Sequence, residues 1–128
     1  MKFYIQSFGC QMNVYDSESI TGILRATGHE PVSDMREADL VLLNTCSVRR
    51  GAETRVLGQL GHLKSMKRRG VIRHIGVCGC MAQKHQRNLL EECDYIDLLI
   101  GPSALPALPR LLERLTLGDG PLMEFSIM

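Results

Sequence analysis

The chain has 128 residues, 45% of them hydrophobic, which is enough for one domain with a proper core. A formal net charge of +1 describes a soluble protein, and no apolar run approaches the ~20 residues that a membrane span requires. The N-terminus lacks the basic start, apolar middle and cleavage site of a signal peptide, so we expect a cytoplasmic protein with no membrane partner.

The first half of the chain alternates between strand and helix signals. Residues 2–8 favour a strand, and Asn13 is a suitable N-cap for a helix that Gly28 ends. Residues 30–33 predict a short edge strand, because the proline there cannot donate to a ladder. The unbroken apolar run at residues 40–43 predicts a central parallel strand that is covered on both faces.

The second half continues this alternation. Ser47 is placed to cap a long helix, and residues 72–77 predict the strand that follows it. A helix, a strand and a final helix over about residues 82–93, 95–100 and 105–117 complete the pattern. We therefore expect one domain over residues 1–117 and a linker, cut short, over residues 118–128.

Five strands that alternate with helices predict an α/β fold, a doubly wound parallel sheet with helices on both faces. The flavodoxin-like order 2-1-3-4-5 is the natural one for five strands. This order places the first, third and fourth strands side by side.

A cysteine follows each of these three strands: Cys10, Cys46 and Cys80. Neighbouring parallel strands lie about 4.8 Å apart, and ligands bind beyond the carboxyl ends of such strands, so we expect the three thiols to gather at one edge. The chain has five cysteines, an odd number that argues against a disulfide framework in a cytoplasmic protein. The pattern predicts a thiolate-ligated metal site.

Three thiolates suit either a 4Fe–4S cluster with one open iron or a Cys₃ zinc site with an open position. Cys78 is a candidate for a fourth ligand, although the turn at Gly79 makes its direction uncertain, and Cys93 has the helical spacing of a core residue. A Cys–His catalytic pair is not indicated, because no histidine sits at a strand end beside these cysteines. No P-loop or dinucleotide-binding glycine pattern is present either.

The charge of the chain is unevenly distributed. Residues 48–87 carry ten basic side chains and one acidic side chain, whereas the segments on either side are acidic. Such a block attracts a polyanion such as RNA. From charge alone, a solvated helix face with a basic loop is the simpler explanation.

Three segments carry a family resemblance: Gly-Cys-Gln-Met-Asn at 9–13, Asn-Thr-Cys-Ser-Val-Arg at 44–49 and Gly-Cys-Met-Ala at 79–82. They resemble the three cysteine motifs of the N-terminal domain of the radical-SAM methylthiotransferases, and the resemblance runs from about residue 2 to residue 117. It is strongest to the tRNA branch, which adds a methylthio group to C2 of N6-isopentenyladenosine beside the anticodon.

The resemblance implies that Cys10, Cys46 and Cys80 ligate an auxiliary 4Fe–4S cluster, whose open iron holds the sulfur or methylsulfide that is transferred. It also implies that Asn13 and Asn44 lie close enough to hydrogen-bond near this cluster. For both residues, capping and turn formation are equally good explanations. The partner implied for the full-length enzyme is tRNA.

The chain departs from the family in one respect: it has no Cys-x-x-x-Cys-x-x-Cys motif. In the family, that motif holds a second 4Fe–4S cluster that cleaves S-adenosylmethionine, and a C-terminal RNA-binding domain follows. We therefore expect a sulfur-donor domain that is inactive without its own radical-SAM domain. The alternatives are a non-redox zinc- or metal-binding α/β module and an RNA-interaction module.

Overall fold

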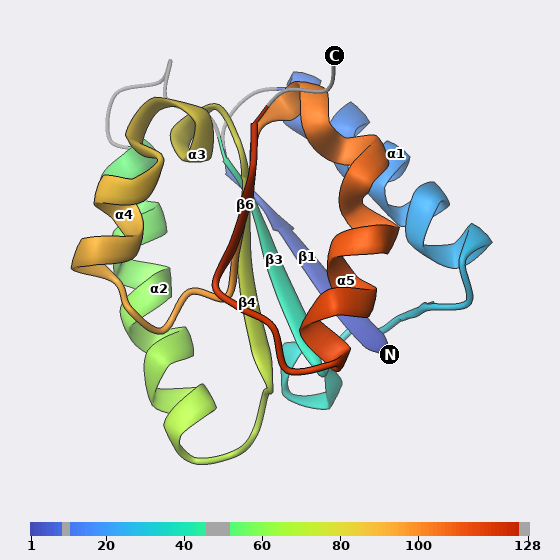
Figure 1. Cartoon of the computed structure of the whole chain (residues 1–128), viewed down its shortest axis with the longest axis horizontal. Coiled ribbons are helices and arrows are strands. Elements are labelled where there is room, and N and C mark those ends of the chain that lie inside the picture. Colours follow the sequence, from blue (N-terminus) through green and yellow to red (C-terminus); the bar gives the residue numbers. More distant parts are fainter. Residues whose placement is uncertain (9–10, 46–51, 126–128) are drawn as a thin grey trace.

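The computed structural model of the chain describes residues 1–8, 11–45 and 52–125, with the backbone alone for residues 11–16, 52 and 53. Six parallel strands form one sheet in the order β2-β1-β3-β4-β5-β6 (Figure 1). The strands are β1 (Lys2–Ser7), β2 (Glu30–Pro31), β3 (Leu40–Thr45), β4 (His74–Gly79), β5 (Leu98–Ile100) and β6 (Leu122–Glu124).

The doubly wound α/β fold and the strand order 2-1-3-4-5 are confirmed, and a sixth strand extends the sheet beyond β5. This strand falls within residues 118–128, where the sequence predicts a linker. Leu122 N–H donates to the Asp97 carbonyl at 2.9 Å, and Gly101 N–H donates to the Glu124 carbonyl at 2.9 Å. Part of the expected linker is therefore an edge strand of the sheet.

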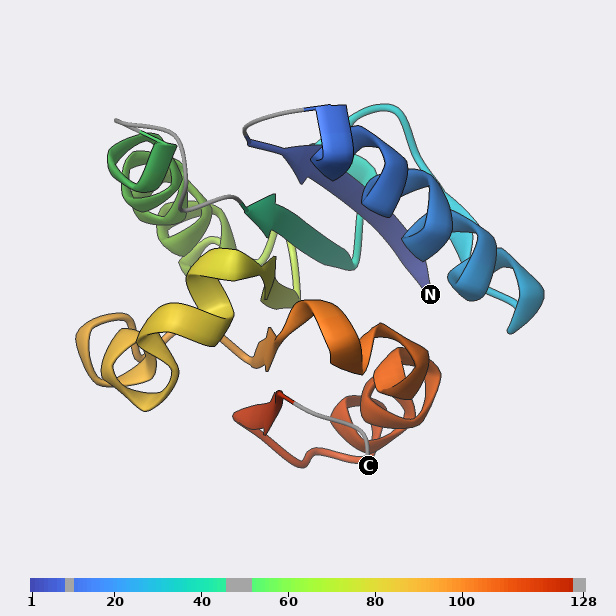
Figure 2. The ribbon, with the colours of Figure 1, turned by 90° about the horizontal axis from the view of Figure 1, so that it is seen from above.

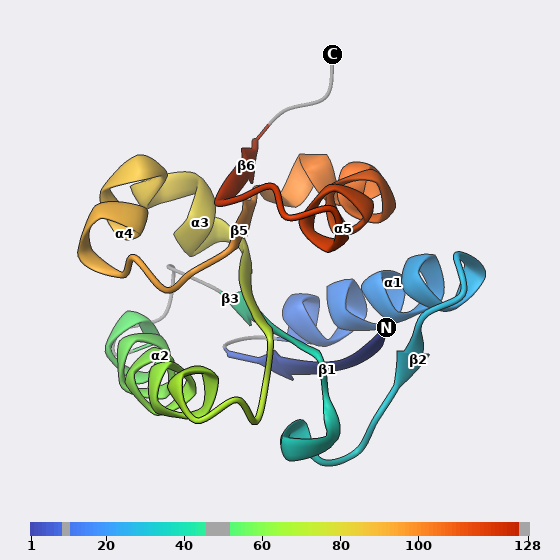
Figure 3. The same ribbon diagram turned by 60° about the horizontal axis from the view of Figure 1, so that its bottom comes forward.

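Helices cover both faces of the sheet, as Figures 2 and 3 show. One face carries α1 (Gln11–Ala26) and α5 (Leu108–Thr116), and the other carries α2 (Ala52–Arg68), α3 (Cys80–His85) and α4 (Arg87–Glu92). Two short 3₁₀ helices, η1 (Met35–Glu37) and η2 (Pro102–Ala107), complete the described elements. No described helix has the length and apolar character needed to cross a membrane.

The apolar run of β3 explains why this strand lies inside the sheet. Val41 and Leu43 pack in the core on the α2 side, whereas Leu40 and Leu42 pack in the core against α1 and α5. All four side chains are fully buried. A strand with apolar side chains on both faces can satisfy them only between two helical layers.

Three helices differ in their boundaries from the sequence prediction. The final helix, predicted from about residue 105, begins as α5 at Leu108, after η2. Helix α1 begins at Gln11, so Asn13 lies within its first turn instead of capping it. Backbone N–H groups of the first turn have no intrahelical partner. A polar residue such as Asn13 is therefore tolerated both at the N-cap and within the first turn. The helix predicted over residues 82–93 is two helices separated by Gln86, whose φ of 46° interrupts the helical path. The predicted cap Ser47 lies outside the described residues.

Asp97, directly before β5, forms hydrogen bonds to α2 and β4 at the amino edge of the sheet. Lys67, in the last turn of α2, donates to its two carboxylate oxygens at 2.9 and 2.8 Å. The backbone N–H of Ile75 on β4 donates to the same carboxylate at 2.9 Å. The pair is half-buried, and it anchors α2 at the end of the sheet opposite the cysteine motifs.

Candidate metal centre

The strands that precede the three candidate cysteines end level with one another. In the sheet register Ser7 on β1 pairs with Asn44 on β3, and Thr45 on β3 pairs with Gly79 on β4. The next residue after Gly79 is Cys80, and the next after Thr45 is Cys46. Cys10 follows Ser7 by three residues, but Cys10 and Cys46 lie outside the described residues.

Gly79 makes the sharp passage from β4 to Cys80 possible. Its φ of 98° lies in the region that side chains rarely adopt, and a Cβ there would lie 2.4 Å from the Thr45 carbonyl oxygen. Only glycine allows the two backbones to approach this closely in this conformation. Cys80 is therefore the first residue of α3, and its side chain is exposed at the carboxyl edge of the sheet.

Thr45 fixes the start of α3 from the neighbouring strand. Its hydroxyl donates to the Cys78 carbonyl at 2.7 Å and accepts the N–H of Met81 at 3.2 Å. Gly79, the N-cap of this helix, has no side chain that can accept this N–H. A buried hydroxyl of β3 thus takes the place of the missing cap and sets the position of Cys80.

Asn44 forms a second buried contact at the same edge. Its side chain is 1% exposed, and its amide Nδ2 donates to the Ser17 hydroxyl on α1 at 3.1 Å. Ser17 also hydrogen-bonds with Ser7 at the end of β1. The amide and the two hydroxyls hold β1, β3 and α1 together at the carboxyl edge of the sheet.

Cys78 and Cys93 do not reach this edge. Cys78 is 1% exposed, lies in the core against α1 and α5, and has its Sγ 3.6 Å from the Leu43 carbonyl oxygen. Cys93 is buried directly after α4, in the core on the other face of the sheet. The interpretation of Cys93 as a packing residue is confirmed, and the orientation of Cys78 into the core disfavours it as a fourth ligand.

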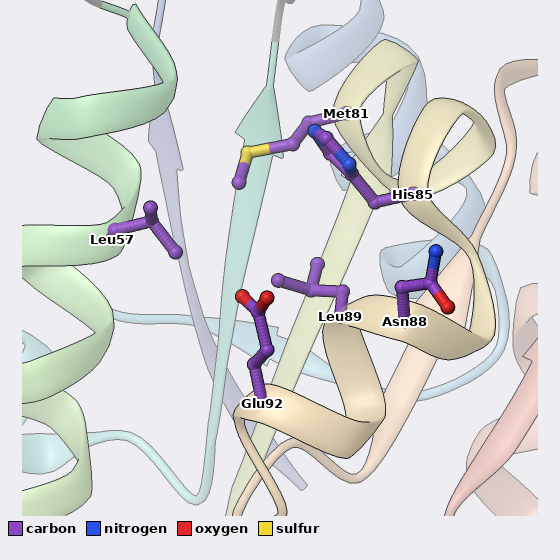
Figure 4. A pocket seen from close by; sticks show the side chains of 6 residues that line it. All are labelled: Leu57, Met81, His85, Asn88, Leu89 and Glu92. Atoms are coloured by element: carbon purple, nitrogen blue, oxygen red, sulfur yellow. The ribbon is translucent and has the colours of Figure 1, made fainter.

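A small pocket flanks the cysteine edge on the α2 side. Figure 4 shows it between α2 and the α3–α4 pair, with the Met81 side chain extending from α3 toward α2. Its volume is about 120 Å³, and it is lined by Leu57, Met81, His85, Asn88, Leu89 and Glu92. Because Met81 directly follows Cys80, this pocket lies close to the start of α3.

Cys80 has the properties of a metal ligand. It is an exposed thiol at the end of a rigid strand, and thiolates are the ligands that iron–sulfur clusters and zinc prefer. Among the described residues no three His, Cys, Asp or Glu side chains form a metal site. The set of Cys10, Cys46 and Cys80, with Asn13 beside it, stays a prediction, since only Cys80 has a described side chain.

Three residues of this edge have no counterpart in the sequence prediction of a site. These are Ser7, Ser17 and Thr45, and each acts through a hydrogen bond between elements. Thr45 lies inside the second cysteine motif, so the sequence singles out this position. The motif does not indicate that the Thr45 hydroxyl caps α3. Ser17 lies on a polar stretch of α1, and nothing in the sequence distinguishes it from its neighbours.

Comparison with known proteins finds one matching family and relatives that share one name. Residues 2–101 match the family described as "Uncharacterized protein family UPF0004". The chain is 46% identical over 114 residues to the "tRNA-2-methylthio-N(6)-dimethylallyladenosine synthase" of Bacillus thuringiensis (strain Al Hakam), covering 88% of this chain and 22% of that protein. It is 44% identical over 119 residues to a protein of the same name from Sulfurihydrogenibium sp. (strain YO3AOP1), covering 93% and 27%. The chain thus spans about a quarter of the length of these relatives.

Proposed function

The chain belongs to the Uncharacterized protein family UPF0004, and from this membership we propose that it is the sulfur-donating domain of a tRNA methylthiotransferase. The levelled ends of β1, β3 and β4 carry the proposal, because each of these strands leads into one of the three cysteine motifs. The names of the similar proteins support tRNA as the substrate and N6-dimethylallyladenosine as the modified nucleoside.

Cys10, Cys46 and Cys80 would hold a 4Fe–4S cluster. When bound, this cluster would supply the sulfur for transfer to C2 of the adenine. The three thiols must ionise to bind it, because the thiolate is the ligand form of cysteine. Three cysteine ligands on a cluster of four irons leave one iron without a protein ligand, which suits a donor better than a structural site.

The remaining residues of the edge position these ligands. Gly79 and Thr45 fix the start of α3 and with it the Cys80 side chain. Asn44, two positions before Cys46 in the sequence, joins the end of β3 to α1 through Ser17. Ligands on strand ends are held more precisely than ligands on free loops.

The whole reaction needs parts that this chain does not contain. We propose that a radical-SAM domain with its own 4Fe–4S cluster and S-adenosylmethionine acts with this domain in the full-length enzyme, together with an RNA-binding domain. The 128-residue chain alone would then bind a cluster without turning over tRNA. Its location in the cell would be the cytoplasm, where tRNA is modified.

Anaerobic reconstitution with iron and sulfide tests the proposal. We expect a coloured chain with about four irons and four sulfides per molecule, as a 4Fe–4S cluster contains. Serine at position 10, 46 or 80 should abolish the colour, whereas Cys93→Ala, the matched control, should keep it. A colourless chain that binds one zinc through the same thiols would instead establish the zinc-binding alternative, and unchanged colour in Cys80→Ser would contradict the ligand assignment.

A further inference from the structure

One exposed stripe of α2 combines positive charge with small side chains. Arg55, Gly58, His62, Ser65 and Arg69 follow one another at intervals of three or four residues, and all five are exposed. Arg69 continues this line one residue after the helix ends. Seven residues of helix rise about 10.5 Å, so the three basic residues are spaced along a line about 21 Å long.

The two arginines of this stripe form no ion pair within the described part of the domain, unlike one of the two lysines on the neighbouring side of α2. Lys64 lies over the Tyr95 ring at 5.4 Å, and Lys67 is paired with Asp97 at 2.8 Å. By contrast, Arg55 and Arg69 form no ion pair with any described residue. No acidic residue occurs anywhere in residues 54–73. The stripe therefore presents uncompensated positive charge to solvent.

Gly58 leaves room for close approach to the helix. It lies in the middle of α2, and a Cβ there would meet nothing within 4 Å. Packing inside the domain therefore does not require glycine at this position, although glycine weakens a helix relative to alanine. Together with Ser65 it leaves the helix backbone thinly covered between Arg55, His62 and Arg69.

The stripe leads into a hollow at the far end of α2. The hollow has a volume of about 480 Å³ and lies between α2 and η1. Met35, Met66 and Val71 give it apolar walls, and His62 and Arg69 add basic groups. Arg36 and Asp34 also line it, as an ion pair of 2.9 Å. Val71 is 36% exposed, one of the few large hydrophobic side chains on the described surface. Apolar walls with basic groups suit an unstacked nucleotide, whose base is flat and whose phosphate is anionic.

We propose that this stripe and the hollow form a docking surface for the sugar–phosphate backbone of the RNA substrate. Arg55, His62 and Arg69 would contact successive parts of the backbone, the gap at Gly58 and Ser65 would let it lie close to the helix, and one base would enter the hollow. The inference rests on the proposed function for the presence of tRNA, but it needs no cluster. Charge complementarity favours RNA over a protein partner, since a line of basic residues from Arg55 to Arg69 with no acidic residue between them matches a polyanion.

Binding of an anticodon stem-loop RNA to the 128-residue chain, measured by fluorescence anisotropy over a series of salt concentrations, tests this surface. Losing one phosphate contact to single-stranded RNA should lower the salt slope by about 0.7, which is about a fivefold loss of affinity near 0.1 M salt. We expect this loss for Arg55→Ala and again for Arg69→Ala. Arg25→Ala is the matched control, because Arg25 is an exposed helical arginine on α1, on the opposite face of the sheet.

A second pair of variants tests the gap in the stripe. Gly58→Glu and Gly22→Glu make the same change at exposed helical glycines whose Cβ positions are open, one on α2 and the other on α1. We expect Gly58→Glu to weaken RNA binding at least about fivefold and Gly22→Glu to leave it nearly unchanged. Circular dichroism confirms that both variants remain folded.

Two results would overturn this inference: no salt-dependent RNA binding by the unmodified chain, or equal losses in the α1 and α2 variants. The same measurement on Cys80→Ser separates this inference from the proposed function. RNA binding that persists in this variant, which is expected to take up no cluster, would show that the docking surface works without the cluster. An unmodified chain that binds RNA but takes up no cluster on reconstitution would refute the sulfur-donor role and retain the docking surface. Cluster uptake without RNA binding would refute the docking surface alone.

Discussion

The hydroxyl of Thr45 on β3 caps helix α3 by accepting the backbone N–H of Met81 across 3.2 Å. The cap comes from a neighbouring strand, because the residue at the N-cap position of α3 is Gly79. The same hydroxyl donates to the Cys78 carbonyl on β4. One side chain thus fixes both the spacing of two strand ends and the start of the helix that carries Cys80.

Replacing Thr45 with valine should destabilise the domain by about 1–3 kcal/mol, because the buried Met81 N–H loses its partner while the volume of the side chain is kept. Urea denaturation monitored by circular dichroism measures the change. Thr45→Ser is the control, since it keeps the hydroxyl and should cost less. Equal losses for serine and valine would show that the hydroxyl does not act as the cap.

Alanine at Gly79 should lower the free energy of unfolding by about 3 kcal/mol or more. The substitution puts a side chain at a φ of 98° and brings Cβ within 2.4 Å of the Thr45 carbonyl oxygen. Gly61→Ala is the matched control, because its Cβ meets nothing within 4 Å in helix α2 and should stabilise the protein by up to about 1 kcal/mol. A mild effect of Gly79→Ala would mean that the β4–α3 junction relaxes readily.

Thiol-specific alkylation of the chain without metal should modify Cys80 well before Cys78 and Cys93. Cys80 is exposed, whereas the other two are 1% and 7% exposed and become accessible only when the domain opens. Mass spectrometry of peptides after short labelling times measures the order. Rapid labelling of Cys78 in the folded chain would contradict its burial in the core and reopen its role as a ligand.

Acid should destabilise the domain partly through Asp97. Burial is the largest single influence and opposes ionisation, but His74, Lys67 and the Ile75 N–H together outweigh it, so the pKa of Asp97 is lowered. A carboxyl with a lowered folded pKa stabilises the protein above its unfolded pKa of about 4, and this stability is lost as the pH falls through the folded value.

We therefore expect Asp97→Asn to cost about 1–2 kcal/mol at neutral pH, where the pair with Lys67 is lost. The difference from the unmodified chain should shrink below about pH 4, as Asp97 protonates. Denaturation at several pH values measures both effects. Asp119→Asn removes an exposed partner of Arg114 and serves as control; a loss as large at position 119 would show that the burial of Asp97 is irrelevant.

The sequence predicts the central elements of this fold because burial on two sides leaves a clear pattern. The run at residues 40–43 indicates β3, and the order 2-1-3-4-5 places β1, β3 and β4 side by side. The break at Gln86 was missed, because a positive φ at a glutamine depends on how α3 and α4 pack and leaves no local signal. Strand β6 was missed for a different reason: it has three residues, only Leu122 is buried, and no periodicity can show in so short a segment.

In the candidate site, too, some features are visible in the sequence and others depend on tertiary packing. The three cysteine motifs are visible as sequence, and so are the ends of the strands before them. The roles of Thr45 and Ser17 depend on the sheet register and on how α1 lies on the sheet, because each hydroxyl bonds a group more than 25 positions away along the chain. Contacts of this kind become predictable only when the register of β1, β3 and β4 is known.

Strand β6 also sets the rim of the sheet at which the described part of the chain ends. It runs parallel to β5, so its carboxyl end at Glu124 points to the same rim of the sheet as the ends of β3 and β4 (Figure 1). A segment attached after Glu124 would therefore leave the sheet at the rim where β4 leads into Cys80. A short tether at that point would hold its cargo at a high effective concentration near Cys80.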